Sequence, residues 1–252
     1  MITPDLVVAF LTLTFLEIVL GIDNIIFISI LANHFPVNKQ KKLIQIGLFL
    51  AMILRIAMLS GISWLIQIKT TLFNVNLDWF SSNISIQALI LLAGGLFLLY
   101  KSTLEIFQKV EDIEEDPINK NLKSISYSRA LFQIILIDIV FSFDSILTAV
   151  GMTNGIPYAL WIMIISVIVS IIIMMSFAAP VSRYINKHPS LQILGLSFLL
   201  LIGFMLIAES AYLSNTTFFG SSIGRIPKGY LYFSITFSLG IEMINMRIRK
   251  RK

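Results

Sequence analysis

Seven long apolar runs constrain the fold of this chain more than any other feature of its sequence. They cover residues 6–31, 44–66, 86–100, 130–150, 159–180, 191–212 and 230–246. A helix needs about 20 mainly apolar residues to cross the hydrocarbon core of a bilayer. Only 13% of the 252 residues are charged, against about 25% in soluble domains. The sequence therefore predicts an all-α polytopic membrane protein with seven transmembrane helices and no sizeable soluble domain.

Most of the 19 Lys and Arg residues lie on one side of this predicted topology. They gather after the first, third, fifth and seventh runs, whereas only Lys69, Arg225 and Lys228 fall on the other side. Because cytoplasmic loops carry the excess of Lys and Arg, the N-terminus is predicted outside and the C-terminus in the cytoplasm. The net charge of +5 then comes from the basic residues of the predicted cytoplasmic loops and tail. The expected partner is the lipid bilayer, with no nucleic acid, and the sequence does not identify protein partners.

Acidic residues occur inside the apolar runs, where the bilayer disfavours them. They are Glu17, Asp23, Asp138, Asp144, Glu209 and Glu242. A charged Asp at the bilayer centre costs about 2.5–3.5 kcal/mol on insertion scales, and Arg55, within the second run, does not neutralise six acids. The acids therefore predict a bound ligand or a function that offsets the cost of placing them in the bilayer. A structural role, with hydroxyl and amide neighbours satisfying the acids, stays open above all for Glu209 and Glu242, near helix ends.

Four of these acids belong to an internal repeat. Its pattern is an acid, a small residue four positions later, a second acid at six and a short polar residue at seven. The two copies are Glu17, Gly21, Asp23 and Asn24, then Asp138, Ser142, Asp144 and Ser145. Because three predicted helices separate the copies, they cross the membrane in opposite directions, as inverted repeats of transporters do.

The repeat predicts the organisation of the chain. Its parts are repeat one at about 6–108, an acidic cytoplasmic loop at about 109–128, repeat two at about 129–212, a seventh helix at about 228–246 and a basic cytoplasmic tail at 247–252. The loop contains five acids followed by Pro117 and reads as a solvated linker.

The two copies offer oxygen ligands. Carboxylates, the Asn24 amide and nearby serine hydroxyls favour a hard divalent cation, namely Mg²⁺, Ca²⁺ or Mn²⁺. The chain has no cysteine, and both histidines, His34 and His188, fall in predicted cytoplasmic loops. These positions argue against a zinc or nickel site built on thiolate or imidazole. Proton transport through the same acids stays open, because carboxylate relays also serve pumps.

The depth of the acids in the membrane has two interpretations. Six residues of helix rise about 9 Å, which predicts two carboxylate levels, Glu17 with Asp144 and Asp23 with Asp138. If both helices unwind near Gly21 and its counterpart in the second copy, as discontinuous transporter helices do, the levels merge into a single site.

Several segments resemble the TerC family of integral membrane proteins along essentially the whole chain. They are residues 16–24 (LEIVLGIDN), 133–145 (QIILIDIVFSFDS), 226–233 (IPKGYLYF) and 240–245 (GIEMIN). The resemblance implies a bacterial-type inner-membrane protein of seven helices, related to transporters with three-helix inverted repeats. Family members are associated with manganese export. The family's functional acids correspond to Glu17, Asp23, Asp138 and Asp144, with Asn24 and Ser145 beside them.

These observations predict a secondary transporter that exports a divalent cation, Mn²⁺ above the others, with protons as the exchanged ion and no permanently bound cofactor. The predicted metal site comprises Glu17, Asp23, Asn24, Asp138, Asp144, Ser145, Glu209 and Glu242. The alternative is a membrane scaffold or metallochaperone partner that supplies metal to client proteins without transmembrane flux. An intramembrane aspartyl protease is disfavoured, because residues 20–23 read Leu-Gly-Ile-Asp instead of Gly-x-Gly-Asp, so the chain is not expected to be an enzyme.

Overall fold

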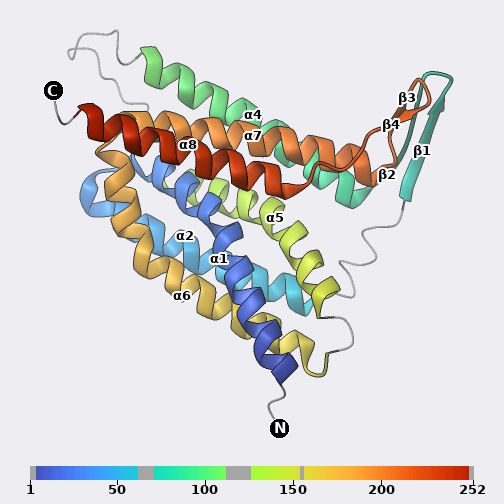
Figure 1. Cartoon of the computed structure of the whole chain (residues 1–252), viewed down its shortest axis with the longest axis horizontal. Coiled ribbons are helices and arrows are strands. Elements are labelled where there is room, and N and C mark those ends of the chain that lie inside the picture. Colours follow the sequence, from blue (N-terminus) through green and yellow to red (C-terminus); the bar gives the residue numbers. More distant parts are fainter. Residues whose placement is uncertain (1–3, 62–70, 112–125, 154–155, 250–252) are drawn as a thin grey trace. The chain divides into compact units, whose positions relative to one another are not determined.

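The computed structural model describes residues 4–61, 71–111, 126–153 and 156–249 (Figure 1). Within these ranges the side chains of seven residues are outside the description: Asp5, Ile22, Asp23, Val37, Asp144, Leu147 and Arg249. The chain divides into two compact units. The first joins Met1–Ile66 to Lys120–Lys187, and the second joins Gln67–Asn119 to His188–Lys252.

The first unit contains four long helices. They are α1 (Pro4–Ala32), α2 (Val37–Ser60), α5 (Tyr127–Met152) and α6 (Ala159–Asn186). α1 packs on α6, and α2 packs on both α5 and α6 (Figure 1). Gly21 permits the close approach of α1 and α6, because a Cβ atom at that position would lie 2.3 Å from the Met174 sulfur.

The second unit is organised around one close helix pair. α4 (Ile86–Glu111) packs along α7 (Pro189–Leu213), and α8 (Lys228–Arg249) contacts α7. Gly95 and Gly203 face each other across the α4–α7 contact, since a Cβ on Gly95 would lie 2.7 Å from the Gly203 carbonyl oxygen and one on Gly203 would lie 3.0 Å from the Gly95 oxygen. Small residues let membrane helices approach in this way. The Ser210 hydroxyl also donates to the Ala88 carbonyl at 2.6 Å.

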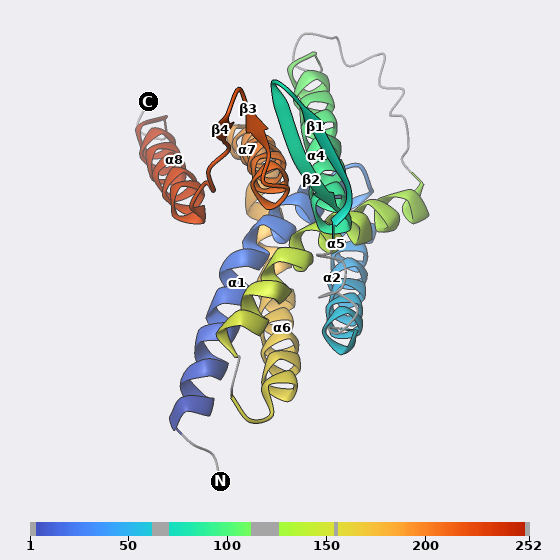
Figure 2. The same cartoon turned by 90° about the vertical axis from the view of Figure 1, so that its right-hand side faces the viewer.

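A small antiparallel sheet in the second unit corrects the all-α prediction. Its strands are β1 (Thr71–Leu77), β2 (Phe80–Ser85), β3 (Thr217–Phe218) and β4 (Ser221–Ser222), in the order β1-β2-β3-β4. β2 leads directly into α4 (Figures 1 and 2), and Phe80 of β2 pairs with Phe218 of β3. Hydropathy assigned both segments to loops between spans. The pairing joins segments far apart in the sequence, so no local pattern reports it.

The described residues of all seven predicted runs are helical, except Gly61, which forms the turn after α2. The second run extends to residue 66, but α2 ends at Ser60 and residues 62–66 are outside the description. α4 continues to Glu111 and α5 begins at Tyr127, so both helices extend into the predicted 109–128 loop, whose residues 112–125 are not described. Glu105, which lies beyond the predicted run 86–100, is buried within α4 and pairs with Lys101 at 2.6 Å.

Six of the described helices are long and apolar enough to cross a membrane, which makes this a polytopic membrane protein. The candidate spans are Leu6–Ala32, Asn38–Ser60, Ile86–Glu111, Tyr127–Met152, Ala159–Asn186 and Pro189–Leu213. The seventh predicted run forms α8, which is not among the six. Glu242 and Asn245 lie within this helix and Arg247 near its end, and these residues lower its apolar character.

Candidate functional site

A buried polar network joins three helices of the first unit. Arg55 of α2 is only 2% exposed and lies between Glu17 of α1 and Asp138 of α5, which are 4% and 2% exposed. Its Nη1 atom donates to Glu17 Oε2. Its Nη2 and Nε atoms lie 3.1 and 3.3 Å from Asp138 Oδ1. Asn24 of α1 donates through Nδ2 to the same oxygen at 2.9 Å.

This network satisfies the physical requirement for charge in a low-dielectric interior. A buried charge is retained when it is paired and hydrogen-bonded, whereas an unpaired one costs several kcal/mol. Glu17 and Asp138 occupy the same position in the two copies of the sequence repeat. A single guanidinium therefore bridges the two equivalent acids.

Arg55 was missed as a site residue by the sequence reasoning. The sequence identifies Arg55 only as a counter-charge, because one cation does not neutralise six acids. The available signal was its position, since Arg55 is the only Lys or Arg within the seven predicted apolar runs. A cation in such a run is costly, and its cost is offset by acids on neighbouring helices.

Some oxygen atoms near this network have no hydrogen-bond partner in the described part of the chain. Asp138 Oδ2 is buried and unpartnered, although Oδ1 accepts three hydrogen bonds. The Ser142 hydroxyl, one turn further along α5, is also buried and unpartnered. Residues four apart share a helix face, so the two oxygens lie on one face. Ser145 donates its hydroxyl to the Ser142 carbonyl at 3.1 Å.

The predicted four-acid site is described only in part. The side chains of Asp23 and Asp144 lie outside the description, although their backbones belong to α1 and α5. Among the residues whose side chains are described, no group of three or more His, Cys, Asp or Glu is arranged to hold a metal ion. Arg55 connects Glu17 and Asp138, which lie at different levels in one of the two interpretations of the sequence and in a single site in the other.

Glu209 and Glu242, the other two predicted ligands, belong to the second unit. Glu209 lies near the end of α7, and its Oε1 atom is 3.4 Å from Arg225 Nε. The Arg225 side chain is 53% exposed, so this contact is typical of a weak surface ion pair. Glu242 lies on α8, and its Oε1 atom is buried with no hydrogen-bond partner among the described residues.

Known sequences similar to this chain cover its whole length. The model of the "Integral membrane protein TerC family" matches residues 2–252. A "UPF0053 protein" of Haemophilus influenzae is 41% identical over 247 residues, covering 98% of this chain and 96% of the relative. The "UPF0053 inner membrane protein YgdQ" of Escherichia coli is 40% identical over 249 residues, covering 99% and 95%.

A longer protein also contains a similar region. The "UPF0053 inner membrane protein YoaE" of Escherichia coli is 40% identical over 247 residues, which are 98% of this chain but 44% of that protein. No solved structure matches this chain.

Proposed function

We propose that this chain, which belongs to the TerC family of integral membrane proteins, is a secondary transporter that exports a divalent cation, Mn²⁺ above the others. We place it in the inner membrane, where the names of two relatives place those proteins. The observation that carries the proposal is the buried network on α1, α2 and α5, in which one carboxylate oxygen of Asp138 and, one helical turn further, the Ser142 hydroxyl have no partner among the described residues.

The charge balance of the apolar runs that form α1, α2 and α5 favours a cation as the ligand. These runs contain four acids, Glu17, Asp23, Asp138 and Asp144, but one basic residue, Arg55. A divalent cation would supply charge that the site lacks when the acids are ionised. Carboxylate, amide and hydroxyl oxygens are the ligands that Mn²⁺, Mg²⁺ and Ca²⁺ accept. The choice of Mn²⁺ among these follows from the family resemblance.

Arg55 gives this site a mechanism of exchange. With no metal bound, its guanidinium holds Glu17 and Asp138. A metal ion that binds Asp138 competes with that guanidinium for the carboxylate. Protons compete as well, because a protonated carboxyl no longer attracts either cation. Metal and protons therefore bind alternately to the same acids, which is the chemistry of a proton-coupled exporter.

Helix contacts within each unit support an architecture of two inverted three-helix repeats plus α8. If α1 corresponds to α5 and α2 to α6, the contact of α1 with α6 corresponds to that of α5 with α2, and both are formed. In the second unit α4 corresponds to α7. Their glycines Gly95 and Gly203 occupy matching positions of a weaker sequence repeat, residues 91–97 and 199–205, and each contacts the other's backbone.

The scaffold alternative is also favoured by one observation. Glu17 and Asp138 are both paired with Arg55, and these ion pairs are compatible with a purely structural role in which the two acids join helices. A scaffold or metallochaperone partner would need no flux, whereas an exporter must move the ion across the bilayer with no other protein present.

Flux measurements in liposomes containing only the purified chain distinguish these functions. We expect Mn²⁺ transport accompanied by proton movement in the opposite direction. Added Mg²⁺ or Ca²⁺ should reduce the Mn²⁺ flux to the extent that the site also binds that ion. Asp138→Asn should abolish flux while preserving insertion, whereas the matched change Glu111→Gln, at an exposed residue of α4, should preserve it. Absence of divalent-cation flux by correctly inserted wild-type protein would reject the transporter proposal and favour the scaffold.

A further inference from the structure

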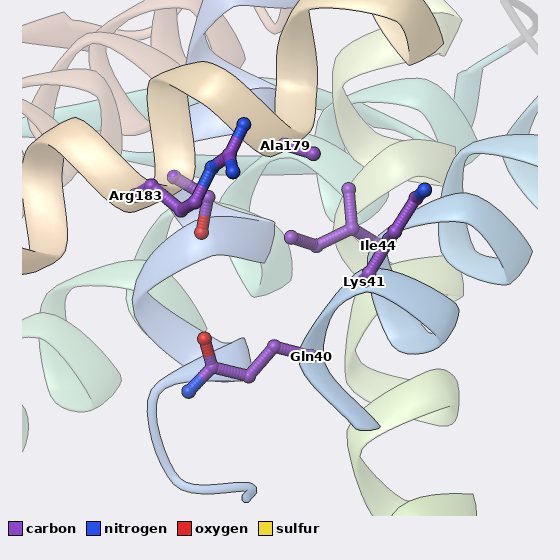
Figure 3. Close-up of a pocket in the computed structure, with 6 residues that line it drawn as sticks. Gln40, Lys41, Ile44, Ala179 and Arg183 are labelled. Carbon is purple, nitrogen blue, oxygen red and sulfur yellow. The ribbon is translucent and has the colours of Figure 1, made fainter. Parts of the chain in front are cut away.

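A basic pocket lies between the start of α2 and the end of α6 in the first unit (Figure 3). Its volume is about 250 Å³. The residues that line it are Gln40, Lys41 and Ile44 of α2 and Ala179, Ser182 and Arg183 of α6. None of them belongs to the polar network around Arg55, so the pocket is a separate feature of the unit.

Hydrogen bonds hold the two sides of this pocket together. Gln40 donates through Nε2 to the Phe35 carbonyl at 2.9 Å, which ties the side chain to the turn before α2. Its Oε1 atom accepts from Asn186 Nδ2 at 3.4 Å, which ties α2 to the last residue of α6. The pocket is therefore built into the contact between two packed helices.

The charge of the pocket is positive. Lys41 and Arg183 are both exposed, and in the view of Figure 3 the Ile44 side chain lies between them. No acid lines the pocket, and neither cation forms an ion pair with an acid in the described ranges. Two cations beside an apolar surface favour a ligand with a negative group and an apolar part.

The position of the two cations along their helices gives their depth. Lys41 is four residues from the start of α2, and Arg183 is three residues from the end of α6, which are axial distances of about 6 Å and 4.5 Å. α6 has 28 residues, hence a length of about 42 Å, whereas the hydrocarbon core measures about 30 Å. The ends of such a helix reach the headgroup layer, and the predicted orientation makes that layer cytoplasmic.

We propose that this pocket binds the phosphate of an anionic phospholipid headgroup. The Arg183 guanidinium can contact two phosphate oxygens at once, and Lys41 adds a second positive charge. Ile44 and Ala179, which line the pocket, contact the apolar part of the lipid next to its headgroup. A free phosphate ion carries the same negative charge but has no apolar part that could contact this lining. Basic pockets between membrane helices bind lipid headgroups by the same chemistry.

Native mass spectrometry of the purified full chain tests this assignment with phosphatidylglycerol and with phosphatidylcholine of the same acyl chains. We expect tighter binding of phosphatidylglycerol. Lys41→Gln and Arg183→Gln should each weaken it about fivefold, since a basic residue near an anionic surface contributes about 1 kcal/mol. Lys42→Gln and Arg129→Gln remove equal charge from exposed residues of the same unit outside the pocket, and should leave binding unchanged.

One further variant and two possible results complete the test of the lipid site. Arg183→Lys keeps the charge but loses the bidentate contact, so its binding should lie between that of the wild type and that of Arg183→Gln when its circular-dichroism melting curve matches the wild type. Binding no better than that of Arg183→Gln would reject a contribution of charge at this position. Equal losses in the pocket variants and the two controls would reject a specific site in favour of general charge attraction. Release of the bound lipid by millimolar inorganic phosphate would assign the pocket to the free ion and overturn the lipid assignment.

Discussion

Asn24 and Asp138, 114 residues apart in the sequence, are joined by a 2.9 Å hydrogen bond from Nδ2 to Oδ1. Asn24 ends the first copy of the repeated polar pattern, and Asp138 begins the second. Two copies that cross a membrane in opposite directions bring the end of one beside the start of the other. The bond thus links the two helices at the positions that an inverted repeat would bring together.

Replacing Asn24 by Leu should destabilise the protein, because a buried carboxylate loses one of its donors. A hydrogen bond to a charged group contributes about 1.5–3 kcal/mol, so the unfolding temperature in detergent should fall. Ser29→Ala is the matched control on α1, since the Ser29 hydroxyl is buried and has no partner among the described residues. This change should be neutral or slightly stabilising. Equal melting of the two variants would show that the amide contributes nothing.

Arg55→Gln should be among the most destabilising single changes in the first unit. It leaves Glu17 and Asp138 buried without their cation, and breaking a buried pair in this way costs about 3–5 kcal/mol. The amount of folded protein extracted from membranes measures the effect. Adding Glu17→Gln and Asp138→Asn to the same chain should restore much of the loss, because no uncompensated charge remains at these positions. Failure of that rescue would mean that Arg55 acts through packing alone.

Gly95→Ala should weaken the α4–α7 contact. The added methyl would lie 2.7 Å from the Gly203 carbonyl oxygen, and overpacking of this kind typically costs about 1–3 kcal/mol. Gly240→Ala on α8 is the control, because a Cβ atom at Gly240 would have no described atom within 4 Å and alanine favours helix over glycine by about 1 kcal/mol. Thermal unfolding should shift down for the first variant and stay level or rise for the second. The reverse order would contradict the packing described for α4 and α7.

The predicted orientation can be tested by labelling, because the chain has no cysteine. Cysteines introduced at Asn76 and Ser221, exposed residues of β1 and β4, should react with an impermeant thiol reagent added to intact cells. A cysteine at Lys39, an exposed residue near the start of α2, should react only after the cells are opened. Labelling of Lys39→Cys in intact cells would reverse the topology and, with it, the assignment of export.

Lys228 makes stability depend on pH in alkaline solution. Burial lowers the pKa of its ammonium group below the usual value of 10.5, so the folded state binds this proton less tightly than the unfolded chain does. The resulting cost is fully present below the folded pKa and disappears as pH rises towards 10.5. The melting temperature of the wild type should therefore rise relative to Lys228→Met over that window. A melting-temperature difference between wild type and Lys228→Met that stays constant over that window would contradict the lowered pKa of Lys228.

The sequence by itself determined the helices and marked the acids that lie within them. A membrane span depends on its own hydrophobic length, because each helix satisfies its backbone hydrogen bonds internally. The runs could therefore be located from local composition, although only six of the described helices are long and apolar enough to cross a membrane. Acids such as Glu17 and Asp138 stood out because the bilayer penalises them. The sheet was missed because Phe80 and Phe218 are far apart in the sequence. The predicted run 86–100 stopped short of Glu111, the end of α4, because the hydropathy signal weakens before the helix ends.

Only the tertiary structure decided which charges meet. Arg55 is 38 residues from Glu17 and 83 from Asp138, and hydropathy carries no information on which faces of three helices turn towards one another. A guanidinium reaches two carboxylates only after α1, α2 and α5 have packed, because hydrogen bonds form over about 3 Å. Local composition thus determines that each helix forms, whereas the pairing of Arg55 with both repeated acids follows from the packing of those helices.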